Sequence, residues 1–339
     1  MSNKYNLAIL GATGLVGETI MEILQQRDFP VNDLSLLASE RSAGKRLSFG
    51  KKNITVQNVE EFDFSNTDIA LFSAGGSVSE KHAPRASQAG CVVIDNTSAF
   101  RYQDDIPLVV SEVNPEKVAD YKTHNIIANP NCTTMQMMPV LKPLSDAVGL
   151  ERMNVASYQA VSGAGKSAMQ KLSHEVAQIM NARGGEGDLS RQLAFNAVPA
   201  IDVLLDNGYT KEEMKIVWES RKILGLPKLR VNATAVRVPV FFGHSMAVNI
   251  ETREKISADK AMKLLEKAPG VRVVDNRDPF EFPTAVSHAT NRDEVFVGRI
   301  REDVSHELGL NLWVVGDNIR KGAALNAVQI AEILVKSHL

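Results

Sequence analysis

A glycine-rich turn near the N-terminus constrains the fold more than any other feature of the sequence. The apolar run 5–10 predicts a buried strand, the turn 11–17 has the spacing G-x-x-G-x-x-G, and an amphipathic helix is expected from 16 to 26. Glycine lets the backbone approach a pyrophosphate, and the following helix offers unpaired N–H groups and a positive dipole end. The strand–turn–helix context therefore predicts a dinucleotide site, with a ligand-free βα turn as the alternative.

Apolar strands alternate with helical segments as far as about residue 130. Strands are expected at 34–38, 68–73, 91–95, 108–110 and 125–128, and a helix is expected at 79–89. Strands that are apolar along their whole length indicate a parallel sheet covered on both faces. The first part of the chain is therefore predicted to be an α/β Rossmann-type domain with a mostly parallel sheet.

The pattern changes after residue 130. Strands are expected at 153–160, 232–239, 244–251, 271–275, 294–301 and 310–315, with helices at 168–180, around 261–267 and at 322–336. The glycine-rich, charged stretch 182–188 predicts a mobile surface loop. This pattern predicts an α+β domain on a largely antiparallel sheet. With 339 residues, two domains are expected, 1–129 with 315–339 and 130–314.

Charge and cysteine content exclude several classes of function. The formal net charge is −2 and the basic residues are scattered, so no nucleic-acid partner is expected. Two cysteines make neither a disulfide framework nor a zinc site, so no metal is expected. No signal peptide and no apolar run of roughly 20 residues is visible, which predicts a soluble, cytoplasmic protein without a membrane partner.

The two cysteines occupy different sequence contexts. Cys91 begins an apolar strand and is expected to be a small core residue. Cys132 follows a strand and a proline turn, and helical spacing begins just after it. A helix N-terminus stabilises a thiolate and can hold an oxyanion, which favours a nucleophile. An inert structural cysteine is the alternative.

The segment after the second strand should contact the adenosine ribose. Glu40 in this position would select NAD, whereas Arg41 and Ser42 would accommodate the 2′-phosphate of NADP. The sequence favours NADP, and a solvated charged loop is the alternative.

Several segments, in order, resemble the aspartate-β-semialdehyde dehydrogenase family. The resemblance runs from residue 4 to the C-terminal helix, and Asn-Cys-Thr-Thr and Arg-Val-Pro-Val with Gly-His are its most specific parts. Shorter connections point to the Gram-positive-type bacterial branch. The matching segments are 11–17, 95–101, 129–134, 237–240, 243–244, 316–318 and 321–323.

The resemblance implies NADPH-dependent reductive dephosphorylation of L-4-aspartyl phosphate to L-aspartate 4-semialdehyde, which feeds lysine, methionine, threonine and isoleucine synthesis. It implies Cys132 as the nucleophile that forms an acyl-thioester, and His244 as the acid/base among seven histidines that the sequence does not otherwise distinguish. The implied substrate-binding residues are Gln159, Arg237 for the α-carboxylate and Glu219 for the α-ammonium group. The implied phosphate-binding residues are Arg101, Lys222 and Asn131, with Arg221 as an alternative to Lys222. The implied cofactor contacts are Gly11, Thr13, Gly14, Leu15, Val16, Arg41, Ser42, Ser73, Gly75, Ser162, Gly163 and Asn318.

The family also implies a catalytic and dimerisation role for the second domain, in a homodimer or a tetramer. Two other functions fit the sequence less well. An N-acetylglutamyl-phosphate reductase shares the thioester mechanism but has an uncharged acylated amine, so Glu219 favours the aspartyl substrate. A non-catalytic NADP-binding paralogue would not need Cys132, His244 and Arg237 together.

Overall fold

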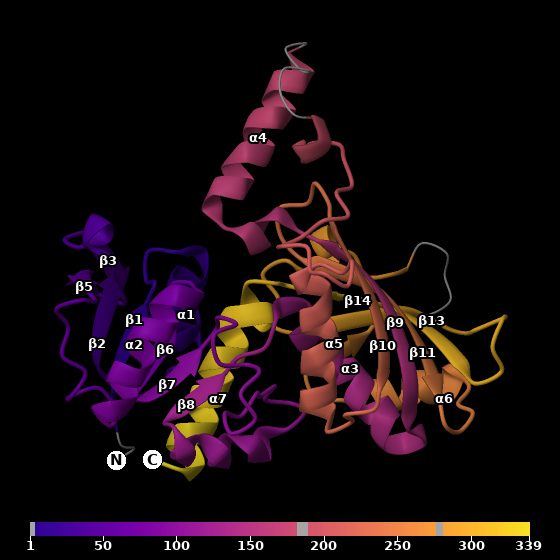
Figure 1. Ribbon diagram of the computed structural model, residues 1–339, viewed down its shortest axis with the longest axis horizontal. Helices are drawn as coiled ribbons and strands as arrows, with labels where there is room; N and C mark the ends of the chain where they lie inside the picture. The colour runs from indigo at the N-terminus through magenta and orange to yellow at the C-terminus, as the bar shows by residue number, and fades with distance from the viewer. Residues whose placement is uncertain (1–3, 182–188, 276–280) are drawn as a thin grey trace. The chain divides into compact units, whose positions relative to one another are not determined.

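The computed structural model describes residues 4–181, 189–275 and 281–339 (Figure 1). The chain divides into two compact units: the first unit is Met1–Asn131 with Ala323–Leu339, and the second unit is Cys132–Gly322. The predicted boundaries lay at 129/130 and 314/315. The predicted mobile loop 182–188 falls outside the described residues.

The first unit is built on a parallel sheet of six strands in the order β5-β2-β1-β6-β7-β8. Because the order reverses between β1 and β6, a topological switch point lies at their carboxyl ends, where such sheets bind ligands. The strands are β1 (Tyr5–Leu10), β2 (Val31–Ala38), β5 (Gln57–Asn58), β6 (Ile69–Phe72), β7 (Val92–Asp95) and β8 (Ile126–Ala128), and a hairpin is formed by β3 (Arg46–Phe49) and β4 (Lys52–Thr55). The helices are α1 (Leu15–Gln26), α2 (Gly76–Gln88) and α7 (Leu325–Ser337).

The strand predicted at 108–110 is wrong. Leu108 makes an isolated bridge to Ala128 and belongs to no strand. The N–H of Val109 still donates to Ala128 O of β8 at 3.1 Å, but Asn326 Nδ2 donates to Val109 O at 2.9 Å and Asn114 Oδ1 accepts the N–H of Val110 at 2.9 Å. Side-chain amides therefore bond the groups that a longer strand would pair with a neighbour.

An amide network fixes α7 within the first unit. Asn326 Nδ2 also donates to Asn129 Oδ1 at 2.6 Å, and Asn129 Nδ2 donates to Asn96 Oδ1 at 2.6 Å and to Ala323 O at 3.0 Å. Asn129 and Asn326 are both fully buried. The network joins the C-terminal helix to the chain just after β8, although these segments lie far apart in the sequence.

The second unit is built on a mixed six-stranded sheet in the order β10-β9-β11-β14-β13-β12. Its central pairs are antiparallel and the pairs at its two edges are parallel, as predicted for a largely antiparallel sheet. The strands are β9 (Leu150–Gln159), β10 (Arg230–Arg237), β11 (His244–Thr252), β12 (Val271–Val273), β13 (Val295–Glu302) and β14 (Gly309–Gly316). The helices are α3 (Cys132–Val148), α4 (Lys166–Met180), α5 (Lys211–Leu224) and α6 (Ala258–Leu265).

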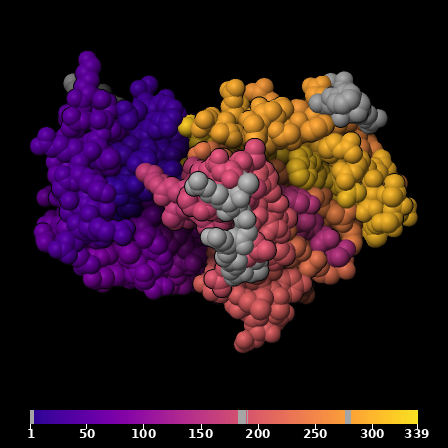
Figure 2. Space-filling view, turned by 90° about the horizontal axis from the view of Figure 1, so that it is seen from above, coloured from indigo at the N-terminus to yellow at the C-terminus, as the bar shows by residue number. Residues whose placement is uncertain are grey.

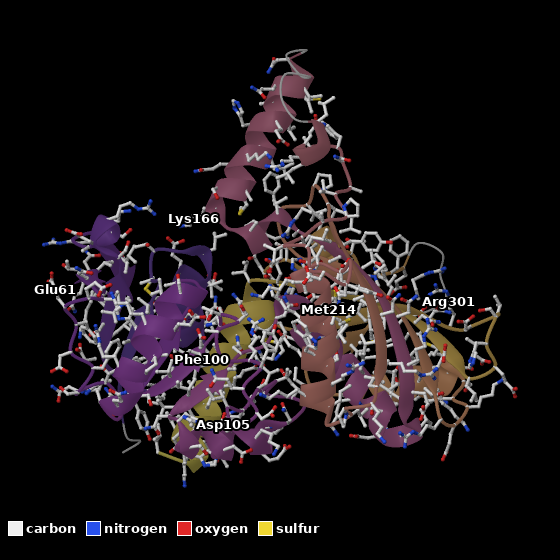
Figure 3. The ribbon with its side chains drawn as sticks, in the orientation of Figure 1. Glu61, Phe100, Asp105, Lys166, Met214 and Arg301 are labelled. Carbon is white, nitrogen blue, oxygen red and sulfur yellow. The ribbon has the colours of Figure 1, made fainter. Side chains whose placement is uncertain are left out.

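Helices α3 and α5 contact each other and pack on the sheet, whereas α4 stands away from it (Figure 1). Helix α4 is therefore the part of the second unit nearest the viewer in Figure 2, which looks from above. Figure 3 shows Lys166 at the end of α4 closer to the sheet, and Met214 on α5 beside the sheet. Short 3₁₀ segments lie at Glu40–Ser42, Pro115–Thr123, Val161–Ala164 and Leu189–Arg191, and π turns lie at Ala285–Ala289 and Arg320–Ala324.

Helix α5 was not predicted, although its sequence carries both end signals. Thr210 Oγ1 accepts the N–H of Glu213 at 3.3 Å, and Glu213 Oε2 accepts the N–H of Thr210 at 2.7 Å. This capping box begins the helix, and Gly225 ends it in the left-handed region at φ +66°. The capping box brings the residues that follow Thr210 into one buried first turn.

Candidate active site

A thiol and an imidazole meet where α3 and β11 begin. Cys132 is the first residue of α3 and His244 the first of β11, and Sγ lies 3.2 Å from Nε2. His244 is fully buried, while Cys132 is half-buried. The N-terminus of a 17-residue helix favours the thiolate form of Cys132. The pair suits a nucleophile with a hydrogen-bond donor beside it.

The backbone determines which nitrogen of His244 carries the proton. Nδ1 accepts the N–H of Ala160 at 3.0 Å, so the neutral ring has its hydrogen on Nε2, facing Sγ. Burial, with the nearby charge of Arg237, lowers the pKa of His244 to about 3. The neutral ring is therefore a hydrogen-bond donor toward the sulfur.

Arg237, the last residue of β10, brings a positive charge to the same place. Its Nη1 donates to Ala160 O at 2.6 Å, and a Cβ on Gly163 would lie 3.2 Å from Nη1 and 3.5 Å from His244 Cε1. Burial lowers the pKa of Arg237, and the charges of Cys132 and Glu212 oppose that shift. The guanidinium thus favours the thiolate electrostatically.

Gln159 is held beside Arg237 by strand pairing and by Glu212. The two residues are partners in the β9–β10 register. Gln159 is 2% exposed, and its Nε2 donates to Ser157 Oγ and to Glu212 Oε1, both at 3.2 Å. Glu212, in the first turn of α5, was not among the predicted site residues. The capping box that opens α5 was the signal that could have drawn attention to it.

Glu219 and Lys222 lie one turn apart on α5. Glu219 is fully buried and Lys222 half-buried, and residues three apart share one face of a helix. Arg221 Nε donates to Leu229 O at 2.9 Å, which commits this guanidinium to the backbone. Lys222 as the phosphate-binding residue, with Arg221 as the alternative, stays a prediction.

The other two predicted phosphate-binding residues, Arg101 and Asn131, belong to the first unit. Arg101 is 6% exposed and its Nη2 donates to Asn96 O at 2.7 Å, and Asn131 is 5% exposed. The pKa of the neighbouring Asp95 is raised by burial, against the opposing effects of its hydrogen bonds to Thr97 and Ser79 and of the charge of Arg101.

The glycine turn has the backbone geometry of a phosphate cradle. Gly11 has φ +91°, and a Cβ there would lie 2.9 Å from the backbone of Ser73. A Cβ on Gly17 would lie 2.3 Å from Gly11 O. Gly14 caps α1 without a side-chain hydrogen bond, so the helix begins with backbone groups alone. Thr13, Leu15 and Val16 complete the turn, which fits a pyrophosphate.

The residues predicted to border the rest of the dinucleotide fall into two groups. Ser73 Oγ donates to Leu10 O at 3.2 Å, and Gly75 has φ +104° just before α2, so both lie at the switch-point edge. Arg41 is exposed in the turn Glu40–Ser42 that follows β2, and Ser42 is buried. An exposed guanidinium at this place fits a ribose 2′-phosphate.

Ser162, Gly163 and Asn318 lie in the second unit close to His244. Asn318 Nδ2 donates to Ser162 Oγ at 2.9 Å, and Asn318 Oδ1 accepts the N–H of Gly243 at 2.9 Å. Both side chains are buried, whereas Gly163 is exposed. The structure therefore brings together Cys132, His244, Gln159, Arg237, Ser162, Gly163 and Asn318 within the second unit.

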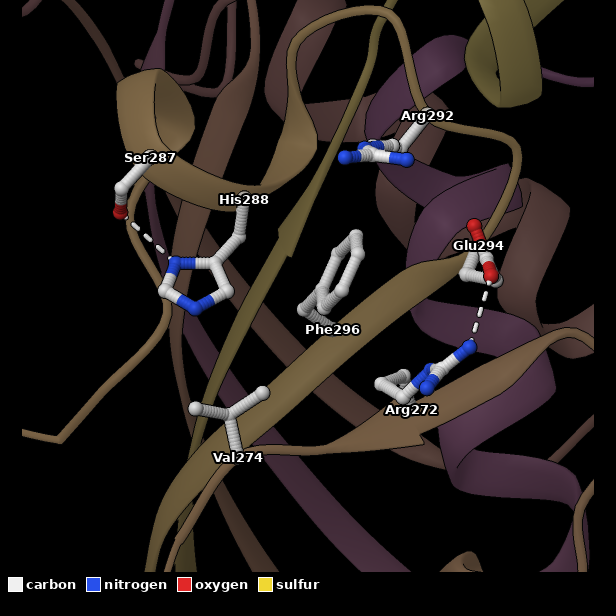
Figure 4. A pocket seen from close by; sticks show the side chains of 7 residues that line it. All are labelled: Arg272, Val274, Ser287, His288, Arg292, Glu294 and Phe296. Carbon is white, nitrogen blue, oxygen red and sulfur yellow. Dashed lines mark hydrogen bonds and ion pairs between the residues drawn. The ribbon is translucent and has the colours of Figure 1, made fainter.

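A cavity of about 320 Å³ lies beside β12 and β13 (Figure 4). Arg272 in its wall pairs with Glu294 at 3.2 Å, and Ser287 Oγ bonds His288 Nδ1 at 2.7 Å. The lining residues are Arg272, Val274, Ser287, His288, Arg292, Glu294 and Phe296, and none of them is a predicted site residue.

Within residues 4–181, 189–275 and 281–339, no cluster of three or more His, Cys, Asp or Glu side chains could hold a metal ion. Over the same residues, no helix has the length and apolar character needed to cross a membrane.

Comparison with known families agrees with this site. The family described as "Semialdehyde dehydrogenase, NAD binding domain" matches residues 6–121, and "Semialdehyde dehydrogenase, dimerisation domain" matches residues 141–321. The fold and the thiol site thus define a semialdehyde dehydrogenase.

The relatives are more specific. "Aspartate-semialdehyde dehydrogenase 2" of Vibrio cholerae is 58% identical over 339 residues, which cover 100% of both chains. The crystal structure of the V. cholerae aspartate semialdehyde dehydrogenase II complexed with ASA has a TM-score of 0.97 at 57% identity, covering 100% of both chains. A Candida albicans aspartate semialdehyde dehydrogenase with NADP has a TM-score of 0.75 at 26% identity over 98% of both chains. The chain belongs to the aspartate-semialdehyde dehydrogenase family, and the Gram-positive-type branch stays a prediction.

Proposed function

We propose that this enzyme reduces L-4-aspartyl phosphate to L-aspartate 4-semialdehyde with NADPH and releases phosphate, in the synthesis of lysine, methionine, threonine and isoleucine. The observation that carries the proposal is the Cys132–His244 pair, at 3.2 Å, in a chain of this family. A thiolate is the nucleophile that this chemistry needs, because an acyl-thioester accepts hydride where a carboxylate does not.

In the proposed mechanism the Cys132 thiolate attacks the acyl carbon, the C–O bond to phosphate breaks, and a thioester forms on Sγ. The N-terminus of α3 and the Nε2–H of His244 stabilise negative charge on sulfur and on the carbonyl oxygen. NADPH, when bound, supplies the hydride. Since Nδ1 already accepts the N–H of Ala160, the geometry supports hydrogen-bond donation from Nε2, the acidic half of the predicted acid/base role.

Substrate recognition is proposed to rest on complementary charges. Arg237 suits the α-carboxylate because its Nη1 is anchored on Ala160 O, which orients the remaining N–H groups. Glu219 suits the α-ammonium group, and Gln159 orients the acyl group near the thioester. Arg101, Lys222 and Asn131 are proposed to bind the phosphate.

NADP is the proposed cofactor. The Gly11–Gly17 turn fits the pyrophosphate, and Arg41 with Ser42 fits the 2′-phosphate. The Candida albicans relative was solved with NADP. Glu40 in the same turn leaves some use of NAD compatible with this site.

A reverse-direction assay tests the proposal. L-aspartate 4-semialdehyde, NADP and inorganic phosphate should give reduced nicotinamide, followed by absorbance at about 340 nm. Cys132→Ser should abolish the rate, while Cys91→Ser, at a buried core position, should keep it. N-acetylglutamate semialdehyde should give no rate. A wild-type enzyme without phosphate-dependent NADP reduction would reject the proposal.

We also propose a homodimer, or a tetramer of two dimers, in the cytoplasm. The second unit matches a dimerisation domain, and the face of its sheet away from α3 exposes Tyr158, whose ring lies 5.7 Å from that of Trp313. The two cysteines, Cys91 and Cys132, are both free thiols, which fits a reducing compartment. Light scattering should find a dimer or tetramer, and a monomer at micromolar concentration would contradict the proposal.

A further inference from the structure

A chain of charged side chains leads from the surface of the second unit to Gln159. Lys215 Nζ donates to Asp202 Oδ2 at 2.7 Å and to Glu212 Oε2 at 2.9 Å. The other carboxylate oxygen of Glu212, Oε1, accepts from Gln159 Nε2 at 3.2 Å. The Asp202 side chain is 31% exposed, that of Lys215 13% and that of Glu212 7%, so burial deepens along the chain.

The series of charged side chains that ends at Glu212 determines which way the Gln159 carboxamide points. Its Nε2 carries two hydrogens, and two acceptors, Ser157 Oγ and Glu212 Oε1, lie within hydrogen-bond distance of it. A flipped amide would place its oxygen against the Glu212 carboxylate, which repels it. The flip is therefore disfavoured, and Oε1 is kept on the side away from Glu212.

Gln159 holds this orientation at the centre of the site. The next residue, Ala160, donates to His244 Nδ1 and accepts from Arg237 Nη1, and Gln159 itself is the strand partner of Arg237. Glu212 also acts on Arg237 directly, because its charge favours the protonated guanidinium. Because a guanidinium stays protonated in proteins whatever its neighbours, the effect of Glu212 on the reaction runs through Gln159.

The stability of the fold does not by itself explain why Glu212 is buried. A buried ion pair is often no more stabilising than apolar residues of the same size. Glu212 is compensated by the N-terminus of α5 and by Lys215, whose pKa is raised because the charges of Glu212 and Asp202 outweigh its burial. The adjacent Glu213 caps the helix, so Glu212 is not needed for that role.

We propose that Glu212 is a positioning residue for the reaction: it fixes the Gln159 carboxamide with Oε1 toward the substrate, and Lys215 and Asp202 hold it in place. The inference rests on the proposed function, because it assumes that Gln159 faces the acyl group. It adds a buried carboxylate to the site and makes Asp202, near the surface, part of its support.

The test is a double-mutant cycle on the full-length enzyme in the phosphate-dependent assay. In Glu212→Gln the remaining side-chain oxygen should turn to the Lys215 ammonium, which leaves the N–H₂ opposite Gln159 Nε2. This change should lower kcat about 10-fold, with KM for NADP within twofold. Gln159→Met should lower kcat at least as much. In the Gln159→Met enzyme, adding Glu212→Gln should change kcat less than twofold, since Glu212 acts through Gln159.

Two further variants separate positioning from folding. Lys215→Met removes the ammonium group that bonds Glu212 Oε2. It should lower kcat about threefold, and it should cause no added loss of kcat in the Glu212→Gln enzyme. Glu213→Gln is the matched control: Glu213 is 7% exposed and bonds the backbone of Thr210 and Ala235, so its change should lower thermal stability and leave kcat within twofold.

The outcomes are distinguishable. If wild type is active and Glu212→Gln keeps kcat within twofold, or if its loss simply multiplies with that of Gln159→Met, Glu212 does not position Gln159 and the inference is overturned. If wild type gives no phosphate-dependent NADP reduction, the proposed function fails and the inference fails with it.

Discussion

Two buried polar networks, one in each unit, use different chemistry. At the centre of the network that holds α7 in the first unit are two neutral amides, Asn129 and Asn326, bonded to each other and to backbone, and Ser111 links Asn326 to Glu112 at the edge of the network. The network around Gln159 in the second unit contains Glu212, Lys215 and Arg237, which are charged. Hydrogen bonds between neutral amides need a close fit of the groups, and their strength does not change with pH. Buried charged groups stabilise one another only while each keeps its protonation state, so their contribution changes with pH. We therefore expect the first unit to be sensitive to added volume and the second to altered charge.

The largest effect should come from Arg237→Lys in the second unit. The guanidinium bonds Ala160 O through Nη1 and has further N–H groups for a carboxylate, whereas an ammonium is a single point of charge. We expect kcat/KM for aspartate semialdehyde to fall about 100-fold, with KM for NADP unchanged. Arg230→Lys, at the exposed start of the same strand, is the control and should stay within twofold. If Arg237→Lys lowered kcat/KM for aspartate semialdehyde less than threefold, the second unit would not depend on its buried charges as we expect.

Gly11→Ala in the first unit should have the opposite pattern: it should weaken NADP binding and leave substrate binding unchanged. Its φ of +91° and a Cβ only 2.9 Å from the Ser73 backbone make even a methyl group costly. We expect KM for NADP to rise about 30-fold, equivalent to about 2 kcal/mol, while KM for aspartate semialdehyde is unchanged. Gly76→Ala meets no atom within 4 Å and should bind NADP normally. An unchanged KM for Gly11→Ala would show that the cofactor does not approach this backbone.

Asn326→Ala tests the neutral network through stability. It leaves Val109 O and Asn129 Oδ1 without their donor, which should lower the free energy of unfolding by about 2 kcal/mol. In urea denaturation this loss should be the same at pH 6 and pH 9, because no group in the pair titrates there. Gln329→Ala, one turn later and half-buried, should cost less. A loss that varied with pH would contradict the contrast between the two units.

The smallest expected effect is a pH dependence of stability arising from His244. The pKa of His244 is about 3 in the folded protein against an ordinary value of 6.5, so between these values only the unfolded chain takes up the proton. The stability from keeping the ring neutral is therefore complete above about pH 7 and is lost as the pH falls. At pH 5.5 the loss should be about 1.4 kcal/mol relative to pH 8.

Urea denaturation of wild type and His244→Gln at pH 8, 6.5 and 5.5 isolates this contribution. The difference in unfolding free energy between the two proteins should shrink or reverse as the pH falls. Parallel profiles would show that the imidazole is not kept neutral by the fold.

The sequence predicted most of the elements, and its misses have two causes: an overlooked local signal and contacts between residues far apart in the chain. The strand–turn–helix around Gly11 and the helix start at Cys132 were predicted, because their signals are local. Helix α5 was missed in spite of a local signal, Thr210 with Glu213. The segment 108–110 has an apolar strand sequence, yet Asn326, more than 200 positions away, bonds its backbone instead.

The site residues divide in the same way. Cys132 followed from its context, whereas His244 came from the family resemblance, because nothing local distinguishes it from the other histidines. The Ala160 N–H that selects its tautomer lies 84 positions away, and Glu212 lies 53 positions from Gln159. Such contacts depend on how β9, β11 and α5 pack, so no spacing of residues in the sequence predicts them.

The hydrogen bond from Ala160 to His244 has a consequence for ligand design. With its proton on Nε2 and its other nitrogen occupied, the imidazole presents a donor and no acceptor to whatever lies over Cys132. A reversible covalent inhibitor should therefore carry an oxygen acceptor on the carbon that Sγ attacks, as aldehydes and activated ketones do. A warhead whose adduct directs an N–H at Nε2 should bind more weakly, by the cost of two opposed donors.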